Sequence, residues 1–287
     1  MNKFFKFRKP GKGIIFFWLD RLVICIIAFL LFVFSYSFCR IIIRGKKNMP
    51  HFGQILCIAN HPSTIGIFAG LVAVFWPWVI KFMEMVPVIV AKWKYVRWTG
   101  PLRLILFHFN VIAVRDKTEV GKRKAVVRAE VDVLTNTDNC ALWLFAEGTR
   151  TEFENELLGR FNPGVGRVVA EARPTIVFVW DQGSSLACPK GSWPRWQIKW
   201  LRGFIPLPCR QLVTISISRP ISAADPTTHL YWLCQQGKPE EVAQKVADYL
   251  HDLCWGFAVS NHPELTSLVN EEVLGDLAKI TLITKAS

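Results

Sequence analysis

Apolar residues between positions 40 and 218 occur in short runs, and each run predicts a β-strand. The runs at 141–145 and 175–180 are continuously apolar, which is typical of strands buried on both faces of a parallel sheet. The run at 212–218 alternates apolar and polar residues instead, which favours a strand at the edge of the sheet. The other predicted strands are 40–44, 54–59, 86–90 and 111–114.

Helical spacing separates several of these runs. Residues 122–134 and 239–255 repeat apolar side chains at intervals of three and four, which predicts two helices that each bury one face. The second of them begins with two glutamates, which suit the positive N-terminus of a helix. A further apolar helix is predicted at 67–80, interrupted by Pro77. Strands alternating with helices predict an α/β fold with a mostly parallel central sheet flanked by helices on both faces.

The N-terminal segment has a different pattern. Residues 22–39 are apolar except for two serines, and this length is close to the roughly 20 residues that span a bilayer. A second apolar piece at 14–19 precedes it, and Asp20 and Arg21 between the two predict a bend at the membrane interface. Basic residues flank both ends, so we expect a membrane-associated helical hairpin, with a single span as the alternative. A cleaved signal peptide is disfavoured because no small-residue cleavage site follows.

Residues 190–210 form a second unusual segment, with five basic residues and no acidic one. Trp193, Trp196 and Trp200 would share one face of a helix. Indole rings and basic side chains at this spacing fit the headgroup zone of a bilayer. A groove for single-stranded nucleic acid and an aromatic core stripe with a solvated basic edge are the alternatives.

Composition narrows the class of protein. Of the 287 residues, 51% are hydrophobic, and 35 Lys and Arg against 22 Asp and Glu give a net charge of +13. Disorder is excluded because it requires low hydrophobicity, and only one run approaches spanning length. Residues 1–47 carry a net charge of +9 and residues 190–210 carry +5, which leaves −1 for the rest. We therefore expect anionic membrane lipids as partners and no nucleic acid, which would not explain the apolar run.

The eight cysteines form no C-x-x-C pair, and no histidine is spaced to complete a zinc site. We expect buried thiols of a reducing compartment and no metal.

Polar residues follow three of the predicted strands, where α/β proteins place their sites. Asn60 and His61 come directly after the strand 54–59, and a histidine there can take a proton from a hydroxyl at neutral pH. The alternative is a histidine that only makes structural hydrogen bonds. Arg115 follows the strand 111–114 in the same way. Three strand ends with polar residues predict one shared cleft.

The third strand end carries the sequence FAEGTR at 145–150. Gly148 lets backbone approach a ligand closely, Thr149 offers a hydroxyl, and Arg150 has a planar guanidinium suited to phosphate. The alternative is an ordinary turn with an exposed arginine.

These segments resemble the glycerolipid acyltransferases typified by lysophosphatidic acid acyltransferase, including the tafazzin branch. Asn60 and His61 match the start of the family's Asn-His-x4-Asp motif, and NVIAVR puts Arg115 in place of its phosphate-contacting arginine. FAEGTR matches the family's Phe-Pro-Glu-Gly-Thr-Arg except at Ala146. The segment RFNPGVGRVVAEARPTIVFVW resembles the fourth region, and AKWKYVRWTGPLR, which contains Lys92, also resembles family sequence. The motifs cover roughly residues 40–180 in the family's order.

The resemblance implies a glycerol-phosphate acyltransferase-like fold and a membrane-bound O-acyltransferase of phospholipid synthesis or remodelling. In that family His61 would deprotonate the hydroxyl of a lysophospholipid such as 1-acylglycerol-3-phosphate, which attacks an acyl thioester. Acyl-CoA or acyl-ACP would be the co-substrate, with no bound cofactor and no metal. The catalytic domain would lie on the cytoplasmic face of the membrane. The substrate-binding residues implied are Asn60, Lys92, Arg115, Glu147, Gly148, Thr149 and Arg150.

Gly66 departs from this pattern, because the family has Asp there to orient the imidazole of the histidine. No acidic residue occurs at 21–83, so a replacement must come through the fold, and Glu84, Asp116 and Glu147 are the candidates. Two alternatives follow: a catalytically degenerate relative that binds anionic lipids, and a tafazzin-like phospholipid transacylase. Asn162 is a second departure, where relatives often have Lys, and Arg160 is its possible substitute.

The chain is expected to have three parts. Residues 1–39 form the basic and apolar membrane anchor, and residues 40–225 form the acyltransferase α/β domain. Residues 226–287 form a helical extension packed on that domain.

Overall fold

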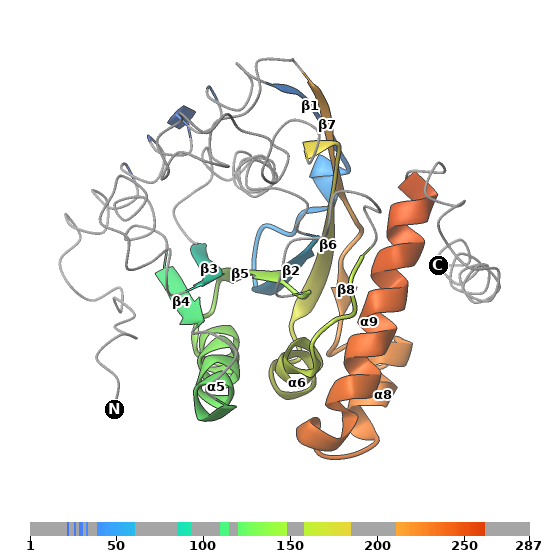
Figure 1. Ribbon diagram of the computed structural model, residues 1–287. Helices are drawn as coiled ribbons and strands as arrows, with labels where there is room; N and C mark the ends of the chain where they lie inside the picture. Colours follow the sequence, from blue (N-terminus) through green and yellow to red (C-terminus); the bar gives the residue numbers. More distant parts are fainter. Residues whose placement is uncertain are drawn as a thin grey trace.

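The computed structural model describes residues 22, 26, 29, 30, 33, 39–60, 85–92, 110–114, 120–147, 158–184 and 211–261. Within these residues one sheet of eight strands forms the centre, with helices packed against it (Figure 1). The strands are β1 (Cys39–Arg44), β2 (Gln54–Ala59), β3 (Val86–Lys92), β4 (Asn110–Val114), β5 (Cys140–Phe145), β6 (Thr175–Gln182), β7 (Gln211–Ile217) and β8 (Ile221–Ser222). The helices are η1 (Lys46–Asn48), α5 (Val120–Asn136), α6 (Pro163–Ala172), α8 (His229–Gln235) and α9 (Pro239–Asn261).

The strands follow one another across the sheet in the order β1-β7-β6-β2-β5-β3-β4. From β6 to β4, each neighbouring pair is parallel. β7 runs antiparallel to β6 and parallel to β1, and the short β8 pairs antiparallel with β6. The sheet is therefore mixed but mostly parallel, and the α/β fold class predicted from the sequence is confirmed.

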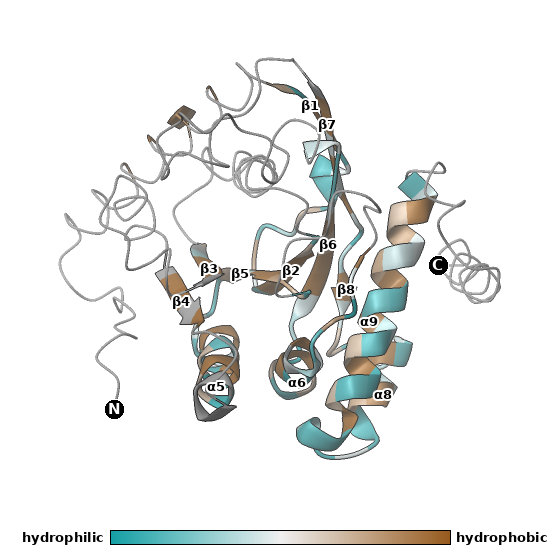
Figure 2. Cartoon of the chain, in the orientation of Figure 1, coloured by the Kyte–Doolittle hydropathy of each residue, from teal (hydrophilic) through white to brown (hydrophobic). Residues whose placement is uncertain are grey.

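The central strands are buried on both faces, as their continuous apolar sequences predict. Leu56 and Ile58 of β2 pack in the cluster that includes the helices, whereas Ile55 and Cys57 pack in the cluster on the opposite face. This alternation follows from the pleat of a strand, which sends successive side chains to opposite faces. Figure 2 shows the hydrophobic residues concentrated along these strands and hydrophilic residues along much of α9.

Helices α5, α6 and α9 pack on one face of the sheet (Figure 1). The predicted helices at 122–134 and 239–255 are confirmed, and both extend beyond their predicted ends. α6 and α9 approach closely at Gly166, where a Cβ atom would collide with the carbonyl oxygen of Ala243. Glycine is therefore required at the α6–α9 contact, because any side chain at position 166 would push the two helices apart.

β7 corrects the prediction of an edge strand at 212–218. β7 lies inside the sheet, between β1 and β6, and Val213, Ile215 and Ile217 are buried. The strand that covers its outer side is β1, which comes from a part of the chain far earlier in the sequence. The alternation of apolar and polar residues within one strand gives no information about so distant a partner. The pattern at 212–218 therefore predicted an edge strand where the structure has an interior one.

Five described residues come from the apolar N-terminal segment, and all five are helical. Their exposed fractions range from 44% to 59%, and their spacing of four, three, one and three residues places them on one helical face. They are Leu22, Ile26, Phe29, Leu30 and Val33. Among the described residues, no helix is long and apolar enough to cross a membrane.

The predicted hairpin, the helix at 67–80 and the tryptophan-rich segment at 190–210 lie largely or wholly outside the described residues. The five described cysteines are buried free thiols, as expected: Cys39, Cys57, Cys140, Cys234 and Cys254.

Candidate functional site

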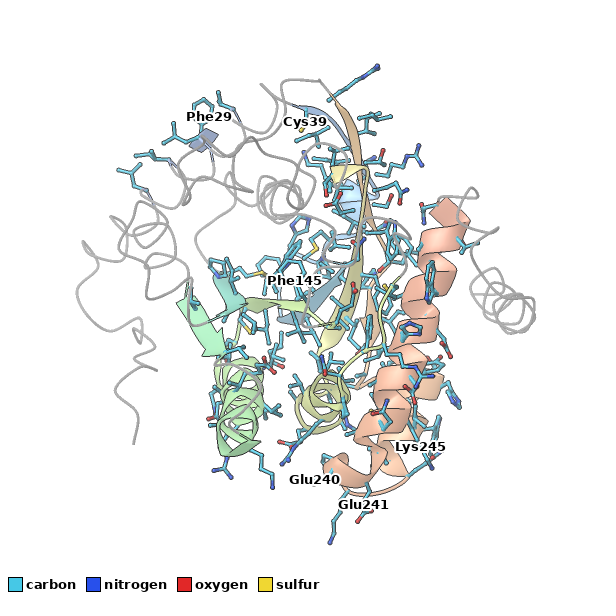
Figure 3. The ribbon with its side chains drawn as sticks, in the orientation of Figure 1. Phe29, Cys39, Phe145, Glu240, Glu241 and Lys245 are labelled. Atoms are coloured by element: carbon cyan, nitrogen blue, oxygen red, sulfur yellow. The ribbon has the colours of Figure 1, made fainter. Side chains whose placement is uncertain are left out.

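The structure brings the carboxyl ends of β2, β5, β3 and β4 to one edge of the sheet. Ala59, the last residue of β2, pairs in register with Phe145, the last residue of β5. Phe145 lies near the middle of the sheet (Figure 3). Lys92 and Val114, which end β3 and β4, pair in the same way. The segments that begin at Asn60 and Ala146 therefore follow two neighbouring parallel strands that end at the same height along the sheet, where α/β proteins place their sites.

Asn60 fixes the end of β2 to β6. Its Nδ2 donates to the carbonyl oxygen of Asp181 at 2.9 Å, and the Asp181 backbone N–H donates to Asn60 Oδ1 at 2.7 Å. A side-chain amide has both a donor and an acceptor, so one residue can satisfy both backbone groups of Asp181. Asn60 is only 6% exposed. The residue that precedes His61 is thus held by two buried hydrogen bonds.

Asp181 is a buried carboxylate at this edge that the sequence analysis missed. It is 5% exposed, and Ser184 Oγ donates to its Oδ2 at 2.5 Å. The signal in the sequence was a charged residue at the end of the apolar run TIVFVWDQ. An isolated charge in a strand is rarely buried unless it is paired, so its position marks it as unusual.

Glu147 lies two residues beyond β5, and its carboxylate is partly buried. The backbone N–H of Gly159 donates to Glu147 Oε2 at 3.1 Å. Burial raises the pKa of the Cys254 thiol on α9, and the negative charge of Glu147 raises it further. The carboxylate of Glu147 therefore lies on the side of the sheet that the helices cover.

Asn162 ties the turn after β5 to the start of α6. Its Nδ2 donates to the carbonyl oxygens of Ala146 at 3.1 Å and Glu147 at 3.3 Å, and its backbone N–H donates to Ala146 O at 3.1 Å. The sequence marked Asn162 as a departure from a lysine in relatives. In this chain its amide supports the turn that carries Glu147, while Arg160 is exposed.

Several predicted site residues lie outside the described residues, and their roles stay predictions: His61, Gly148, Thr149, Arg150 and Arg115. Two candidates for the missing carboxylate, Glu84 and Asp116, also lie outside them. Lys92 is described as the last residue of β3, through its backbone.

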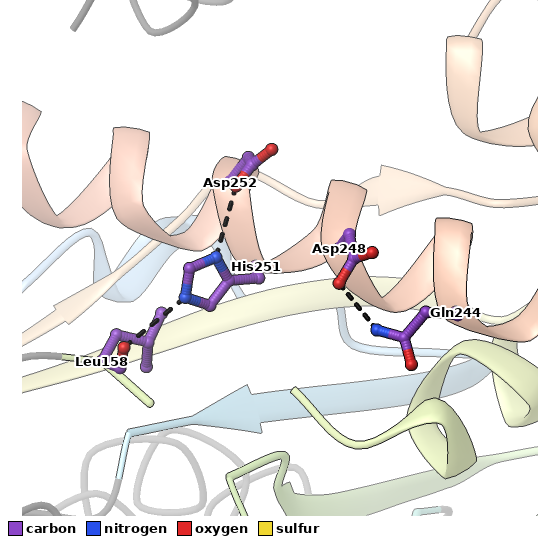
Figure 4. Close-up of polar contacts among 5 residues, drawn as sticks. All are labelled: Leu158, Gln244, Asp248, His251 and Asp252. Atoms are coloured by element: carbon purple, nitrogen blue, oxygen red, sulfur yellow. Dashed lines mark hydrogen bonds and ion pairs between the residues drawn. The ribbon is translucent and has the colours of Figure 1, made fainter. Parts of the chain in front are cut away.

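His251 on α9 is a second histidine beside the turn region, and its contacts are structural. Its Nδ1 lies 3.2 Å from Asp252 Oδ1, and its Nε2 lies 3.5 Å from the carbonyl oxygen of Leu158 (Figure 4). The ring packs edge-on against Phe161, with 5.4 Å between ring centroids. These contacts dock α9 on the segment that leads into α6. Within the part of the chain that the structure describes, no cluster of His, Cys, Asp and Glu is arranged to hold a metal ion.

Comparisons with known proteins agree with this architecture. Residues 40–180 match the family model described as Acyltransferase, and no curated protein sequence matches the chain. The chain is similar to the crystal structure of the 1-acyl-sn-glycerophosphate (LPA) acyltransferase, PlsC, from Thermotoga maritima, with a TM-score of 0.52 and 16% sequence identity. The similarity covers 80% of this chain and 81% of that chain. At this identity the similarity establishes the fold.

Proposed function

We propose that this chain, whose residues 40–180 match the Acyltransferase family model, is a glycerolipid acyltransferase that transfers a fatty acyl group from a thioester to a lysophospholipid hydroxyl. Acyl transfer is the class of reaction that the match to the family model supports. The acceptor, the acyl-CoA or acyl-ACP donor and the membrane location are parts of the proposal.

His61 is the proposed general base. Its imidazole takes the proton of the acceptor hydroxyl, and the oxygen then attacks the carbonyl carbon of the thioester. Collapse of the tetrahedral intermediate breaks the C–S bond, and the departing thiolate is protonated by the imidazolium. General-base catalysis of this kind contributes about 10²–10⁴-fold in rate.

One observation supports the proposal most directly: the motif segments follow parallel strands that end at the same edge of the sheet. His61 is two residues beyond Ala59, and Arg150 is five residues beyond Phe145, its partner in register. Arg115 directly follows Val114, the partner of Lys92. A base and two phosphate-binding arginines that follow strands ending at the same edge of the sheet fit an acceptor that has a hydroxyl close to a phosphate. Glu147 and Gly148 would shape the pocket between them.

The proposed location is a membrane surface. The five exposed apolar residues between Leu22 and Val33 share one helical face, and their exposure to water would be costly. The first 47 residues also carry a net charge of +9, which attracts anionic headgroups. In this arrangement the acyl acceptor arrives from the bilayer and the thioester from the cytoplasm.

Gly66 favours a second candidate function, a degenerate relative that binds anionic lipids without turnover. A transacylase that takes its acyl group from another phospholipid is a closer variant of the first proposal. The three functions differ in donor requirement and in dependence on His61, so one assay distinguishes them.

The test is acyl transfer to lysophosphatidic acid in membranes that contain the wild type, His61→Ala or Gly66→Asp, with acyl-CoA, acyl-ACP or a labelled phospholipid as donor. We expect thioester-dependent transfer that falls at least about 100-fold in His61→Ala. His51→Ala, at an exposed position, is the matched control. Equal rates for the wild type and His61→Ala, with a gain in Gly66→Asp, would establish the degenerate relative.

Membrane attachment is tested by truncation. The structure sets the boundary at residue 38, because β1 begins at Cys39 and belongs to the sheet. We expect deletion of residues 1–38 to release the protein from sedimenting membranes in high salt. Continued sedimentation would reject the N-terminal segment as the anchor.

A further inference from the structure

We propose that Asp181 is the positioning residue for His61 and replaces the carboxylate that the family motif lacks here at Gly66; this rests on the proposed function. A histidine that acts as a base needs its imidazole held in one tautomer, and a neighbouring carboxylate commonly does this. Residues 21–83 contain no Asp or Glu, so a carboxylate in this role comes from a more distant part of the chain.

The register of the sheet points to two carboxylates, Asp181 and Glu147. β2 and β6 are parallel, and Ala59 is the register partner of Val179. His61 and Asp181 are each two residues beyond this last pair. Glu147 has the same relation through β5, because it lies two residues beyond Phe145, the other register partner of Ala59.

The hydrogen bonds of Asn60 strengthen this assignment. Both of them go to the backbone of Asp181, at 2.9 and 2.7 Å. His61 directly follows Asn60, and adjacent Cα atoms in a chain are about 3.8 Å apart. The bonds use the backbone of Asp181 and not its carboxylate.

The carboxylate of Asp181 is buried and oriented, as a positioning group must be. Only 5% of Asp181 is exposed, and Ser184, which is completely buried, donates to Oδ2 at 2.5 Å. A carboxylate accepts several hydrogen bonds, so the bond from Ser184 is compatible with another from an imidazole N–H. Retaining a charge in this place is costly and needs compensation from such donors.

Glu147 is the competing carboxylate, and its contacts assign it elsewhere. Its Oε2 accepts from Gly159 N at 3.1 Å, and its charge acts on Cys254 of α9, on the helix-covered side of the sheet. Successive side chains of a strand point to opposite faces of the sheet. Trp180 packs in the cluster with the helices, so Asp181 lies on the other face, together with Val177 and Val179.

The test uses the isosteric variant Asp181→Asn in the full-length protein. Asn keeps the backbone groups that bind Asn60 but cannot hold an imidazole N–H as a carboxylate does. We expect kcat to fall about 100-fold or more, with less than about a threefold change in KM for lysophosphatidic acid. Asp132→Asn, at an exposed position on α5, is the matched control and should retain wild-type kcat.

A second variant separates positioning from structure. If Asp181 replaces the motif carboxylate, adding Gly66→Asp to Asp181→Asn should restore kcat at least about tenfold. Ser184→Ala, which loosens the Asp181 carboxylate, should lower kcat about threefold to tenfold even if Asp181→Asn fails to fold. Wild-type kcat in Asp181→Asn, or in Ser184→Ala where the first variant is unfolded, would overturn the assignment.

The outcomes also distinguish this inference from the proposed function. An inactive His61→Ala with a fully active Asp181→Asn rejects only the role of Asp181. Equal rates for the wild type and His61→Ala reject acyl transfer by this histidine, and the role of Asp181 with it.

Discussion

Asn60 and Asp181 are joined by two hydrogen bonds that run from one side-chain amide to both backbone groups of the other residue, although 121 residues separate them in sequence. The bridge extends the pairing of β2 and β6 one step beyond their last paired residues. It thereby fixes the point from which the chain enters the first acyltransferase motif. A motif asparagine thus acts here as part of the sheet.

Replacing Asn60 by Ala should destabilise the protein and lower its activity. Loss of the amide leaves the buried N–H and C=O of Asp181 without these partners, at a cost of about 1–3 kcal/mol for each group. We expect a decrease of about 2–4 kcal/mol in the free energy of unfolding, measured in urea. Asn136→Ala, at the exposed end of α5, should change it by less than about 0.5 kcal/mol. An unchanged midpoint for Asn60→Ala would contradict the bridge.

Asn162→Ala should affect turnover more than stability. The variant keeps the backbone hydrogen bond to Ala146 but loses the two side-chain bonds that hold the turn before Gly148. We expect a stability loss of about 1 kcal/mol, because these groups are partly exposed. Acyl transfer should fall by about tenfold through poorer positioning, read as kcat/KM for lysophosphatidic acid. A variant with wild-type kcat/KM would show that the turn is held without Asn162.

Gly166→Ala should disrupt the contact of α6 with α9. The added Cβ would collide with Ala243 O and lie 2.8 Å from the backbone nitrogen of Ala247, and neither backbone atom can move without shifting α9. We expect a loss of about 3 kcal/mol or more in thermal or urea unfolding.

Gly164→Ala in the same helix is the matched control. Its added Cβ would meet only Val127 Cγ2 at 3.4 Å, so the higher helix propensity of alanine should leave stability unchanged or raised by up to about 1 kcal/mol. Equal effects of the two substitutions would contradict close packing at Gly166.

Glu130 should make stability depend on pH in an unusual direction. Burial raises the pKa of this α5 carboxyl to about 8, against about 4.3 in an unfolded chain. Between these values the folded protein holds a proton that the unfolded chain releases, so this group lowers the free energy of unfolding as pH rises from about 4.5 to about 8.

Glu130→Gln removes this contribution. The stability of the variant relative to the wild type should increase across the same pH interval, by a few kcal/mol at its upper end, as measured by urea unfolding at several pH values. Asp132→Asn, on the exposed face of the same helix, should show no such trend. A difference between Glu130→Gln and wild type that is constant with pH would contradict a raised pKa.

The local sequence was sufficient to predict those strands and helices whose structure depends mainly on their own residues. The strands β2, β5 and β6 were predicted to within two residues because their uninterrupted apolar sequences fit only positions buried on both faces. The helix beginning at Pro239 was predicted because its apolar spacing and its two N-terminal glutamates agree. The same reasoning placed Asn60 and Glu147 just beyond strand ends.

The sequence was insufficient where a structural feature depends on two segments that are far apart in the chain. Leu212 is 47% exposed, and alternation made its strand resemble an edge, yet β1 pairs along its outer side. Asn162 was interpreted through the lysine of relatives, whereas in this fold its amide holds the turn after β5.

The sequence by itself determined the α/β class, the strand ends and the motif residues that follow them, because hydrophobic periodicity and turn chemistry act within a few residues. Only the tertiary structure showed that Asp181 lies beside the end of β2, where Asn60 binds its backbone. Glu84, Asp116 and Glu147 were the candidates from the sequence, and Asp181 became visible through the register of β2 with β6. That register joins strands that are more than 100 residues apart in the sequence, so it depends on how their buried faces pack together and not on the pattern of either strand alone.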